Sequence, residues 1–250
     1  MSTENTVAAS PVIQIKNLKK SFGENSVLRD FNIDLNEGEN IVVLGKSGSG
    51  KSVLIKCIIG LVRPDSGSIK VFGDEVPSLT HDLLDEMRVK VGFLFQGNAL
   101  YDSMTVRENL EFPLRRHWIK TTKESVNDLV TEALSNVGLS ETIDMMPSEL
   151  SGGMRKRIAL ARTLILKPKV ILYDEPTTGL DPITSREISN LILALQKKYN
   201  TASIIISHDM SCARITANKV VMLIDGKCHA SGTYEELSKS TDNKVKQFFD

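Results

Sequence analysis

Alternating hydrophobic and polar positions near the start of the chain give way to unbroken apolar runs further on. The alternation predicts strands at residues 12–15 and 27–35, the first of them an edge strand, which together form an antiparallel β element. The apolar runs at residues 41–44, 170–173 and 202–206 are typical of strands covered on both faces. Because helical patterns separate such runs, the sequence predicts an α/β protein with a mixed, mostly parallel sheet flanked by helices.

Shorter patterns predict further elements. They are helices at residues 53–61 and 183–199, strands at residues 68–72 and 91–95, and a hairpin whose first strand spans residues 220–224 and whose turn is Asp225-Gly226. Thr233 and Glu236 match a capping box for a last helix. The end of the chain, residues 245–249, carries two aromatic residues, which we expect to dock on their own domain or on another copy.

The segment from about residue 97 to residue 157 has a different character. Apolar residues recur there at helical spacing, among them Val126 and Val130, and Gly138 marks the end of a helix. This pattern predicts a helical insertion within a single domain of residues 12–250, preceded by a flexible tail at residues 1–11. No internal repeat or linker-like tract divides the sequence further.

Composition narrows the function classes. The 31 Lys and Arg residues balance 31 Asp and Glu residues, and aromatic residues make up 5% of the chain, which argues against nucleic acid as a partner. Three widely spaced cysteines, Cys57, Cys212 and Cys228, form no disulfide framework or metal motif, so we expect reduced, buried thiols. No apolar run approaches the ~18 residues of a membrane span. If the protein works at a membrane, another chain does the spanning.

A complete G-x-x-x-x-G-K-[ST] motif follows the apolar run at residues 41–44. Its members are Gly45, Lys46, Ser47, Gly48, Ser49, Gly50, Lys51 and Ser52. The glycines let successive amides converge on phosphate oxygens, and the helix that begins near Lys51 adds its positive dipole end. We expect Lys51 to reach the β- and γ-phosphates of ATP and the Ser52 hydroxyl to bind Mg²⁺. A glycine-rich turn without a ligand would need neither side chain.

Two carboxylates close the apolar run at residues 170–173. Successive side chains at a strand end point in opposite directions, so Asp174 is predicted to bind the metal and Glu175 to face the attacking water. An acidic pair after a strand is by itself an ordinary surface turn. The nucleotide motif earlier in the chain favours the catalytic interpretation.

Gln96 and His208 each follow an apolar strand at its carboxyl end, where ligands bind to parallel sheets. Gln96 could coordinate Mg²⁺ or the water, and His208 could donate a hydrogen bond to the γ-phosphate in the transition state. Taken alone, a Gln or His in such a place is more often structural. Ser151, Gly152 and Gly153 open a further predicted helix and make a second possible anion site, for which a plain helix N-cap at Ser151 is the alternative.

The order of these motifs along nearly the whole chain resembles that of the ATP-binding subunits of ABC transporters, whose signature is matched by Leu150-Ser151-Gly152-Gly153. The resemblance implies an ABC-type P-loop NTPase fold, and a homodimer in which ATP lies between the nucleotide loop of one copy and the signature of the other. It further implies that Phe22 stacks on adenine, although a buried Phe in a β element is the competing interpretation. Asp181 would communicate between the two sites.

Three stretches, residues 94–100, 149–157 and 173–182, are similar to the ATPases of bacterial maintenance-of-lipid-asymmetry (Mla) systems, which move phospholipid with Mce-domain partners. Met154 departs from the Gln that most ABC signatures carry, which puts a polar contact to the ribose in doubt. This resemblance implies a lipid transport ATPase, peripheral on the cytoplasmic face of the bacterial inner membrane, with Mce-domain and accessory subunits as further partners.

A multi-span membrane permease would dock near residues 96–113, where Leu100, Tyr101, Met104 and Phe112 lie in a stretch that is too loop-like to be all core. Packing of the helical insertion is the alternative. Other functions remain open: a different ABC transport system, or an ABC ATPase that drives extraction or signalling without translocation. A chromosome-maintenance ATPase would need coiled-coil heptads, a translation factor two nucleotide loops, and a small-molecule kinase no signature.

Overall fold

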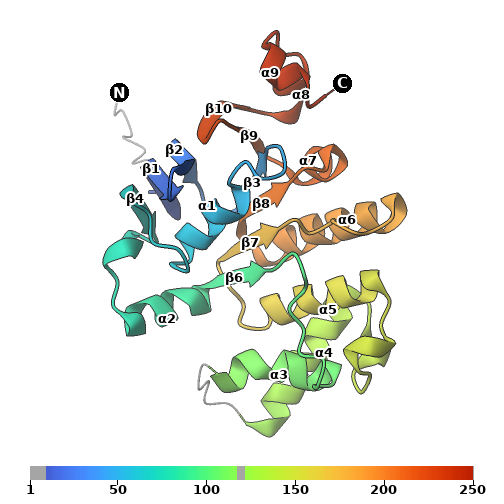
Figure 1. Ribbon diagram of the computed structural model, residues 1–250. Coiled ribbons are helices and arrows are strands. Elements are labelled where there is room, and N and C mark those ends of the chain that lie inside the picture. Colours follow the sequence, from blue (N-terminus) through green and yellow to red (C-terminus); the bar gives the residue numbers. More distant parts are fainter. Residues whose placement is uncertain (1–9, 117–121, 250) are drawn as a thin grey trace, which may run out of the picture.

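The computed structural model describes residues 10–116 and 122–249, and a single ten-stranded sheet runs through this part of the chain (Figure 1). The order of strands is β5-β4-β1-β2-β10-β9-β3-β8-β7-β6. The predicted tail at residues 1–11 falls outside the described residues except for its last two. The strands are β1 (Ile13–Phe22), β2 (Asn25–Leu35), β3 (Asn40–Leu44), β4 (Ser66–Val71), β5 (Asp74–Glu75), β6 (Val91–Leu94), β7 (Val170–Asp174), β8 (Ala202–Ser207), β9 (Lys219–Ile224) and β10 (Lys227–Gly232).

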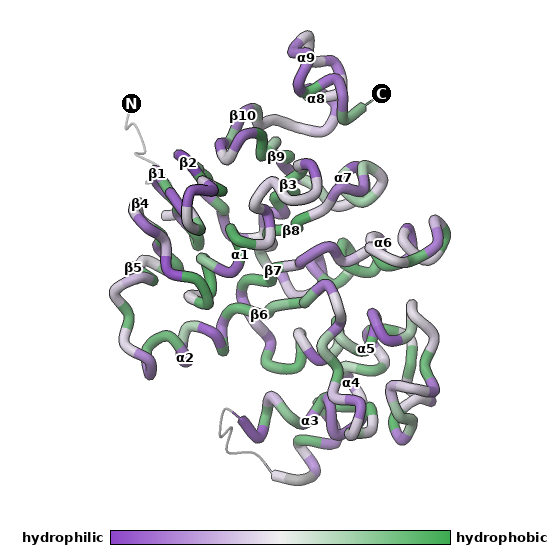
Figure 2. Tube along the Cα trace, viewed as in Figure 1, coloured by the Kyte–Doolittle hydropathy of each residue, from purple (hydrophilic) through white to green (hydrophobic). Residues whose placement is uncertain are grey.

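The parallel half of the sheet confirms the prediction from apolar runs. Strands β6, β7, β8, β3 and β9 pair in parallel, and every residue of β3, β7 and β8 is buried. In Figure 2 this central region is coloured mostly as hydrophobic. Leu44 lies opposite Ser207, and Asp174 lies opposite Ile206. The residues that follow β3, β8 and β7 therefore lie side by side at the carboxyl ends of these strands.

The antiparallel half corrects one prediction. β1 is not an edge strand, because it pairs with β2 on one side and with β4 on the other. Its polar positions, such as Lys16 and Lys19, are exposed on one face of the sheet and do not border an open edge. Alternation reports which face of a strand meets water, and it carries no information on how many neighbours the strand has. The edges of the sheet are β5 and β6.

Helices cover both faces of the sheet (Figure 1). Side chains alternate along β3, so that Ile41 and Val43 pack with α1 while Val42 and Leu44 pack with α5, α6 and α7. The helices are α1 (Lys51–Ile58), α2 (His81–Lys90), α3 (Val106–Arg116), α4 (Lys123–Val137), α5 (Gly152–Leu164), α6 (Pro182–Tyr199), α7 (Met210–Thr216), α8 (Tyr234–Ser238) and α9 (Asn243–Lys246), with short 3₁₀ turns at Val76–Ser78, Ser140–Thr142 and Pro147–Glu149.

The helical insertion has a hydrophobic cluster of its own, built from α3, α4 and α5. Its α4 ends as predicted at Gly138, whose φ of 69° is the left-handed conformation that glycine adopts without strain. The stretch at residues 99–113 is less loop-like than expected, because α3 begins at Val106 and buries Val106 and Leu110 in this cluster. Packing of the insertion therefore accounts for part of that stretch, whereas Tyr101 remains exposed and docking of a permease there stays a prediction.

The end of the chain docks on its own domain. Val245 is fully buried, and Phe248 and Phe249 pack against the cluster beneath α6 and α7. The hairpin turn at Asp225-Gly226 and the capping box of Thr233 and Glu236 are as predicted. Among the cysteines, Cys57 and Cys212 are buried, whereas Cys228 is half-buried. No helix of the described residues combines the length and the apolar character that crossing a bilayer requires.

Candidate functional site

The nucleotide loop links β3 to α1. Gly48 and Gly50 have φ values of 77° and 99°, and a Cβ on Gly50 would lie 2.5 Å from a Val27 methyl group, so that glycine is required there. The first amides of α1 have no partner in their own helix and are available for an anion. Lys51 Nζ donates to the carbonyl oxygens of Gly45 (2.8 Å) and Lys46 (3.2 Å) and is almost fully buried. These two contacts fix its charge beside the first residues of the loop.

Asp174 and Ser52 lie beside each other, as the predicted metal site requires. The Ser52 hydroxyl donates to Asp174 Oδ1 at 2.9 Å. Burial raises the pKa of Asp174, an effect that this hydrogen bond opposes and the neighbouring Glu175 charge reinforces. A buried carboxylate next to a hydroxyl suits Mg²⁺, which prefers oxygen ligands and keeps few protein ligands in phosphate sites. The described residues contain no group of three or more His, Cys, Asp or Glu placed to hold a metal.

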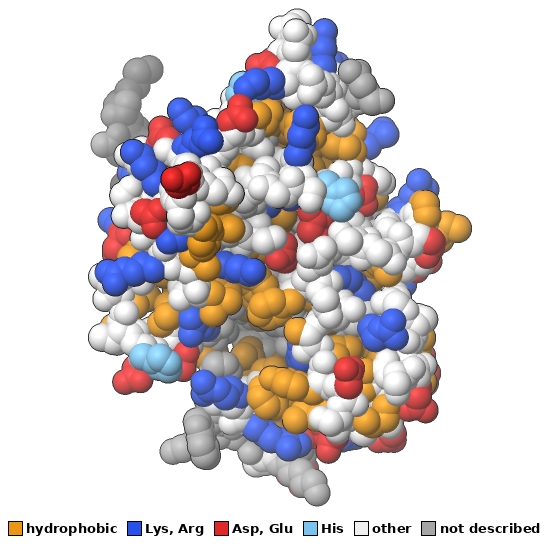
Figure 3. Space-filling model, in the orientation of Figure 1, with side chains coloured by type: hydrophobic (Ala, Val, Ile, Leu, Met, Phe, Trp, Pro, Cys, Tyr) orange, Lys and Arg blue, Asp and Glu red, His pale blue; other side chains and the backbone are white. Residues whose placement is uncertain are grey.

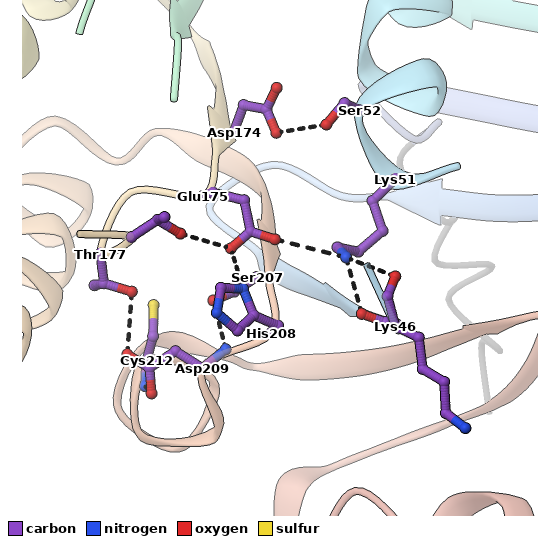
Figure 4. A network of polar contacts seen from close by, with 12 residues as sticks. Lys46, Lys51, Ser52, Asp174, Glu175, Thr177, Ser207, His208, Asp209 and Cys212 are labelled. Carbon is purple, nitrogen blue, oxygen red and sulfur yellow. Dashed lines mark hydrogen bonds and ion pairs between the residues drawn. The ribbon is translucent and has the colours of Figure 1, made fainter. Parts of the chain in front are cut away.

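Glu175 is the centre of a polar network, shown in Figure 4. Its carboxylate lies 3.5 Å from Lys51 Nζ, contacts His208 Nδ1 at 2.8 Å and accepts from the Thr178 hydroxyl at 3.2 Å. As predicted, it points away from Asp174, which faces Ser52. Glu175 has a φ of 52°, a left-handed conformation that is costly for a non-glycine residue and is typical of functional sites.

His208 belongs to this network, whereas the side chain of Gln96 does not contact it. His208 contacts Glu175, and its side chain is otherwise largely exposed. Gln96 is exposed, and its side chain forms no hydrogen bond within the described residues; its backbone carbonyl accepts from Lys156 Nζ at 3.0 Å. The role of Gln96 in binding Mg²⁺ or the water therefore remains a prediction, and it concerns the site with nucleotide bound.

The signature residues form a separate site. Ser151 is the N-cap of α5 and accepts from the Met154 amide at 3.2 Å, as the structural alternative expected. A hollow of about 550 Å³ is lined by Ser151, Gly152 and Gly153 together with Gly179 and Leu180. Within the described residues, no hydrogen bond joins this hollow to the nucleotide loop. One copy thus presents the nucleotide loop and the signature residues as two separate sites, because the residues that line this hollow include none of the loop.

Asp181 lies at the rim of the same hollow and caps α6. Its carboxylate accepts from the Ile183 and Thr184 amides at 3.0 Å, and the Thr184 side chain and amide hold the pKa of Asp181 below its usual value. Phe22 is 52% exposed at the end of β1, so the interpretation as a buried Phe is wrong. Lys20 Nζ lies 5.2 Å from the centre of the Phe22 ring, and stacking of this exposed ring on a base stays a prediction.

Two parts of the site were missed by sequence reasoning. Thr177 donates to Asp209 at 3.0 Å, and Asp209 caps α7, so these residues fix the loops that carry Glu175 and His208. A second hollow of about 470 Å³ lies beside Lys46, Val27 and Phe248, and brings the end of the chain to the nucleotide loop. An Asp directly before a short helix was the signal from which the contact of Thr177 with Asp209 could have been predicted. No local pattern indicates the hollow beside Lys46.

This geometry defines a class of protein. A strand, a glycine-rich loop and a helix carry Lys51 and Ser52, and the acids at the end of β7, a parallel strand separated from β3 by β8, meet both of them. That is the arrangement of a P-loop nucleoside triphosphatase.

Comparisons with known proteins narrow the class. Residues 28–178 match the sequence model of the ABC transporter family. The chain is 41% identical to the probable ribonucleotide transport ATP-binding protein mkl of Mycobacterium leprae, and the match covers 94% of this chain and 68% of that relative. This chain spans 66% of the length of the Mycobacterium tuberculosis counterpart. It is 37% identical to the intermembrane phospholipid transport system ATP-binding protein MlaF of Haemophilus influenzae, covering 95% of this chain and 89% of MlaF.

Among solved structures, the fold matches the ATP-binding cassette MJ0796, solved as a dimer in a post-hydrolysis state with ADP and Pi, with a TM-score of 0.81, 30% identity, and coverage of 89% of this chain and 98% of that one. The chain therefore belongs to the ABC transporter family. It is the ATP-binding, ATP-hydrolysing subunit of an ABC transporter, as its motifs predicted.

Proposed function

We propose that this ATPase energises phospholipid transport through a separate membrane permease, with Mce-domain and accessory subunits in the same assembly. The observation that carries the proposal is the likeness to MlaF, which extends over 95% of this chain and 89% of that protein. Other relatives are named for ribonucleotide transport and methionine import, so another ABC transport system is the alternative. Partnership with a permease would place the subunit on the cytoplasmic face of the bacterial inner membrane.

We further propose that two copies close on two ATP molecules. The support is the dimer formed by the similar cassette MJ0796, together with the separation of the two surfaces in one chain: the residues that line the hollow at Ser151 include none of the nucleotide loop. In the closed pair, the Ser151 hydroxyl and the amides of Gly152 and Gly153 would contact the nucleotide on the partner's loop. Asp181, at the rim, would lie at the contact between copies.

The network around Glu175 supplies the chemistry. Lys51 would exchange its contacts with carbonyls and Glu175 for phosphate oxygens, which frees the Glu175 carboxylate to orient the attacking water. His208 would hold Glu175 in place through Nδ1 and offer its other nitrogen to the terminal phosphate. Mg²⁺, when bound by Ser52, Asp174 and Gln96, would neutralise phosphate charge. Phe22 would stack on the adenine.

The permease would dock on the surface near residues 96–113. In Figure 3, hydrophobic side chains gather on the visible face where the loop after β6 meets α3. Phe95 and Tyr101 are 39% and 42% exposed, and the rings of Tyr101 and Phe112 pack at 4.7 Å. Exposed aromatics of this kind are typical of a surface that receives a partner helix.

Purification of the complex from membranes, followed by reconstitution in liposomes, tests the proposal. We expect a multi-span partner with bound phospholipid, and ATP-dependent movement of a labelled phospholipid that Glu175→Gln abolishes. Tyr101→Glu should release the permease, whereas Leu61→Glu, a control at another exposed apolar side chain, should retain it. A complex that carries no lipid and responds to methionine or a ribonucleotide would instead establish the alternative.

A further inference from the structure

The loop after β6, residues 96–99, holds an unfavourable backbone conformation. Asn98 and Ala99 have φ values of 63° and 53°, so two adjacent non-glycine residues occupy the left-handed region. Asn tolerates this conformation through its short polar side chain, but Ala has no such compensation. Such a conformation persists only where the surroundings fix it.

Two cations from α5 fix this loop. Lys156 Nζ donates to the Gln96 carbonyl at 3.0 Å. The Arg162 guanidinium donates to the carbonyls of Asn98 (3.0 Å) and Ala99 (2.8 Å), and its Cζ lies 5.8 Å from the centre of the Tyr101 ring. The loop is therefore held by its backbone, independently of the side chain that Gln96 presents.

Removing these cations from water, fully for Lys156 and in part for Arg162, is costly. Lys156 is 2% exposed, and burial lowers the pKa of both Lys156 and Arg162, a shift that the Asp174 charge opposes at Lys156. Packing alone would be served as well by an apolar side chain. Other arginines of the same helix have other partners: Arg155 donates to the Leu150 carbonyl, and Arg157 donates to the Val137 carbonyl and pairs with Glu187. Lys156 and Arg162 instead contact the loop after β6.

We infer that Lys156 and Arg162 are positioning residues, which tie the loop of Gln96 to the helix that begins at the signature. This inference rests on the proposed role of Gln96 in the loaded site. One rigid helix then carries Ser151 at its first turn, Lys156 about 7.5 Å further along and Arg162 about 16 Å along. A displacement of the signature by the partner's nucleotide shifts Gln96 with it, because both are attached to the same helix.

Conservative exchange of Arg162 separates positioning from charge. Arg162→Lys keeps the charge but loses the planar fork that holds two carbonyls at once. Arg88→Lys is the matched control, since Arg88 likewise donates to two adjacent carbonyls, those of Ile59 (3.1 Å) and Gly60 (3.4 Å), away from the Gln96 loop. Each exchange is made in the native chain and in Gln96→Ala. The kcat, the KM for ATP, the Mg²⁺ dependence of hydrolysis and the Tm are measured in the assembled complex.

We expect Arg162→Lys to lower kcat about tenfold and to raise the Mg²⁺ concentration needed for half-maximal rate, with KM for ATP within about twofold. In the Gln96→Ala background it should cause no further loss, because the residue through which it acts is gone. Arg88→Lys should lower Tm comparably and leave kcat unchanged. Lys156→Gln, which retains a donor, should fall between native and Arg162→Lys.

Three results would overturn the inference. An equal loss from Arg162→Lys in both backgrounds, or no loss in either, means that Arg162 does not act through Gln96. A comparable fall in kcat for Arg88→Lys means that the effect is one of stability. If Gln96→Ala itself hydrolyses ATP at the native rate, the proposed role of Gln96 is wrong and the inference falls with it. The results described above for Arg162→Lys and Arg88→Lys would overturn the inference but leave the proposed role of Gln96 standing.

Discussion

Replacing Glu175 by Gln removes one negative charge from the most connected group of the site. The Glu175 carboxylate lies 3.5 Å from Lys51 Nζ, with both side chains almost fully buried. At an effective dielectric constant of about 20, two unit charges at that separation attract by about 5 kcal/mol, an upper bound on the loss. Gln keeps an oxygen for Thr178, and Lys51 keeps its two carbonyl partners, so we expect the nucleotide-free protein to lose about 1–2 kcal/mol.

ATP reverses the sign of this effect. With the triphosphate bound, Lys51 gains phosphate oxygens as partners, and the Glu175 charge then repels the nucleotide. For a chain of this size, about 1–2 kcal/mol corresponds to a Tm lower by about 2–8 °C without nucleotide. We expect a larger ATP-induced rise in Tm for Glu175→Gln than for the native protein. Loss of the group that orients the water should lower kcat by about 10²–10⁴.

Thermal melts with and without ATP, together with phosphate release, measure these quantities. Glu75→Gln is the control, because Glu75 accepts from the Ser68 hydroxyl (2.6 Å) and the Ile69 amide (3.0 Å) away from the nucleotide loop, and should leave both the ATP-induced rise and kcat unchanged. Native-rate hydrolysis by Glu175→Gln would refute its role with the water. An unchanged ATP-induced rise in Tm would refute the electrostatic reasoning.

Three further predictions follow from the same site. Lys51→Ala should abolish turnover and weaken ATP binding, measured by phosphate release and calorimetry; undiminished hydrolysis would contradict the phosphate contact. Asp174→Asn should make the nucleotide-free protein increasingly more stable than the native one as pH rises from about 4 to 8, because the pKa of Asp174 is raised in the folded state and the native fold loses stability as this carboxyl ionises. Thermal melts across that range measure the difference. The same dependence of Tm on pH in both proteins would contradict this prediction. In a mixture of Ser151→Arg and Lys51→Ala, only one of the two sites in a mixed dimer can be intact, so hydrolysis that returns to the full native rate would exclude shared sites.

The nucleotide loop and the strand-end acids could be predicted from sequence because their information is local. Lys51, Ser52 and the glycines around them are contiguous, and the acids directly follow a buried strand. Parallel pairing then brings Asp174 to Ser52, since β3 and β7 both pair in parallel with β8 and their carboxyl ends therefore lie at the same end of the sheet. The left-handed backbone of Glu175 has no such signal: Glu is an ordinary residue, and the conformation is imposed by tertiary contacts.

Non-local pairing limited the rest. The neighbours of β1 depend on β4, which lies more than forty residues away from it in sequence, and alternation is the same for an edge and an interior strand. α3 was missed because Pro113 interrupts its pattern, although a helix can retain a proline near its end. The contact of Arg162 with Asn98 joins two segments that carry no shared motif.

The separate hydrophobic cluster of α3, α4 and α5 has a consequence for cooperativity. A segment with its own core can lose its structure while the sheet beneath it stays intact, so amide hydrogens of the insertion should exchange as one unit ahead of those in β3, β7 and β8. Nucleotide shared between two copies would protect that unit from exchange, although it lies far along the chain from the loop that holds the phosphates.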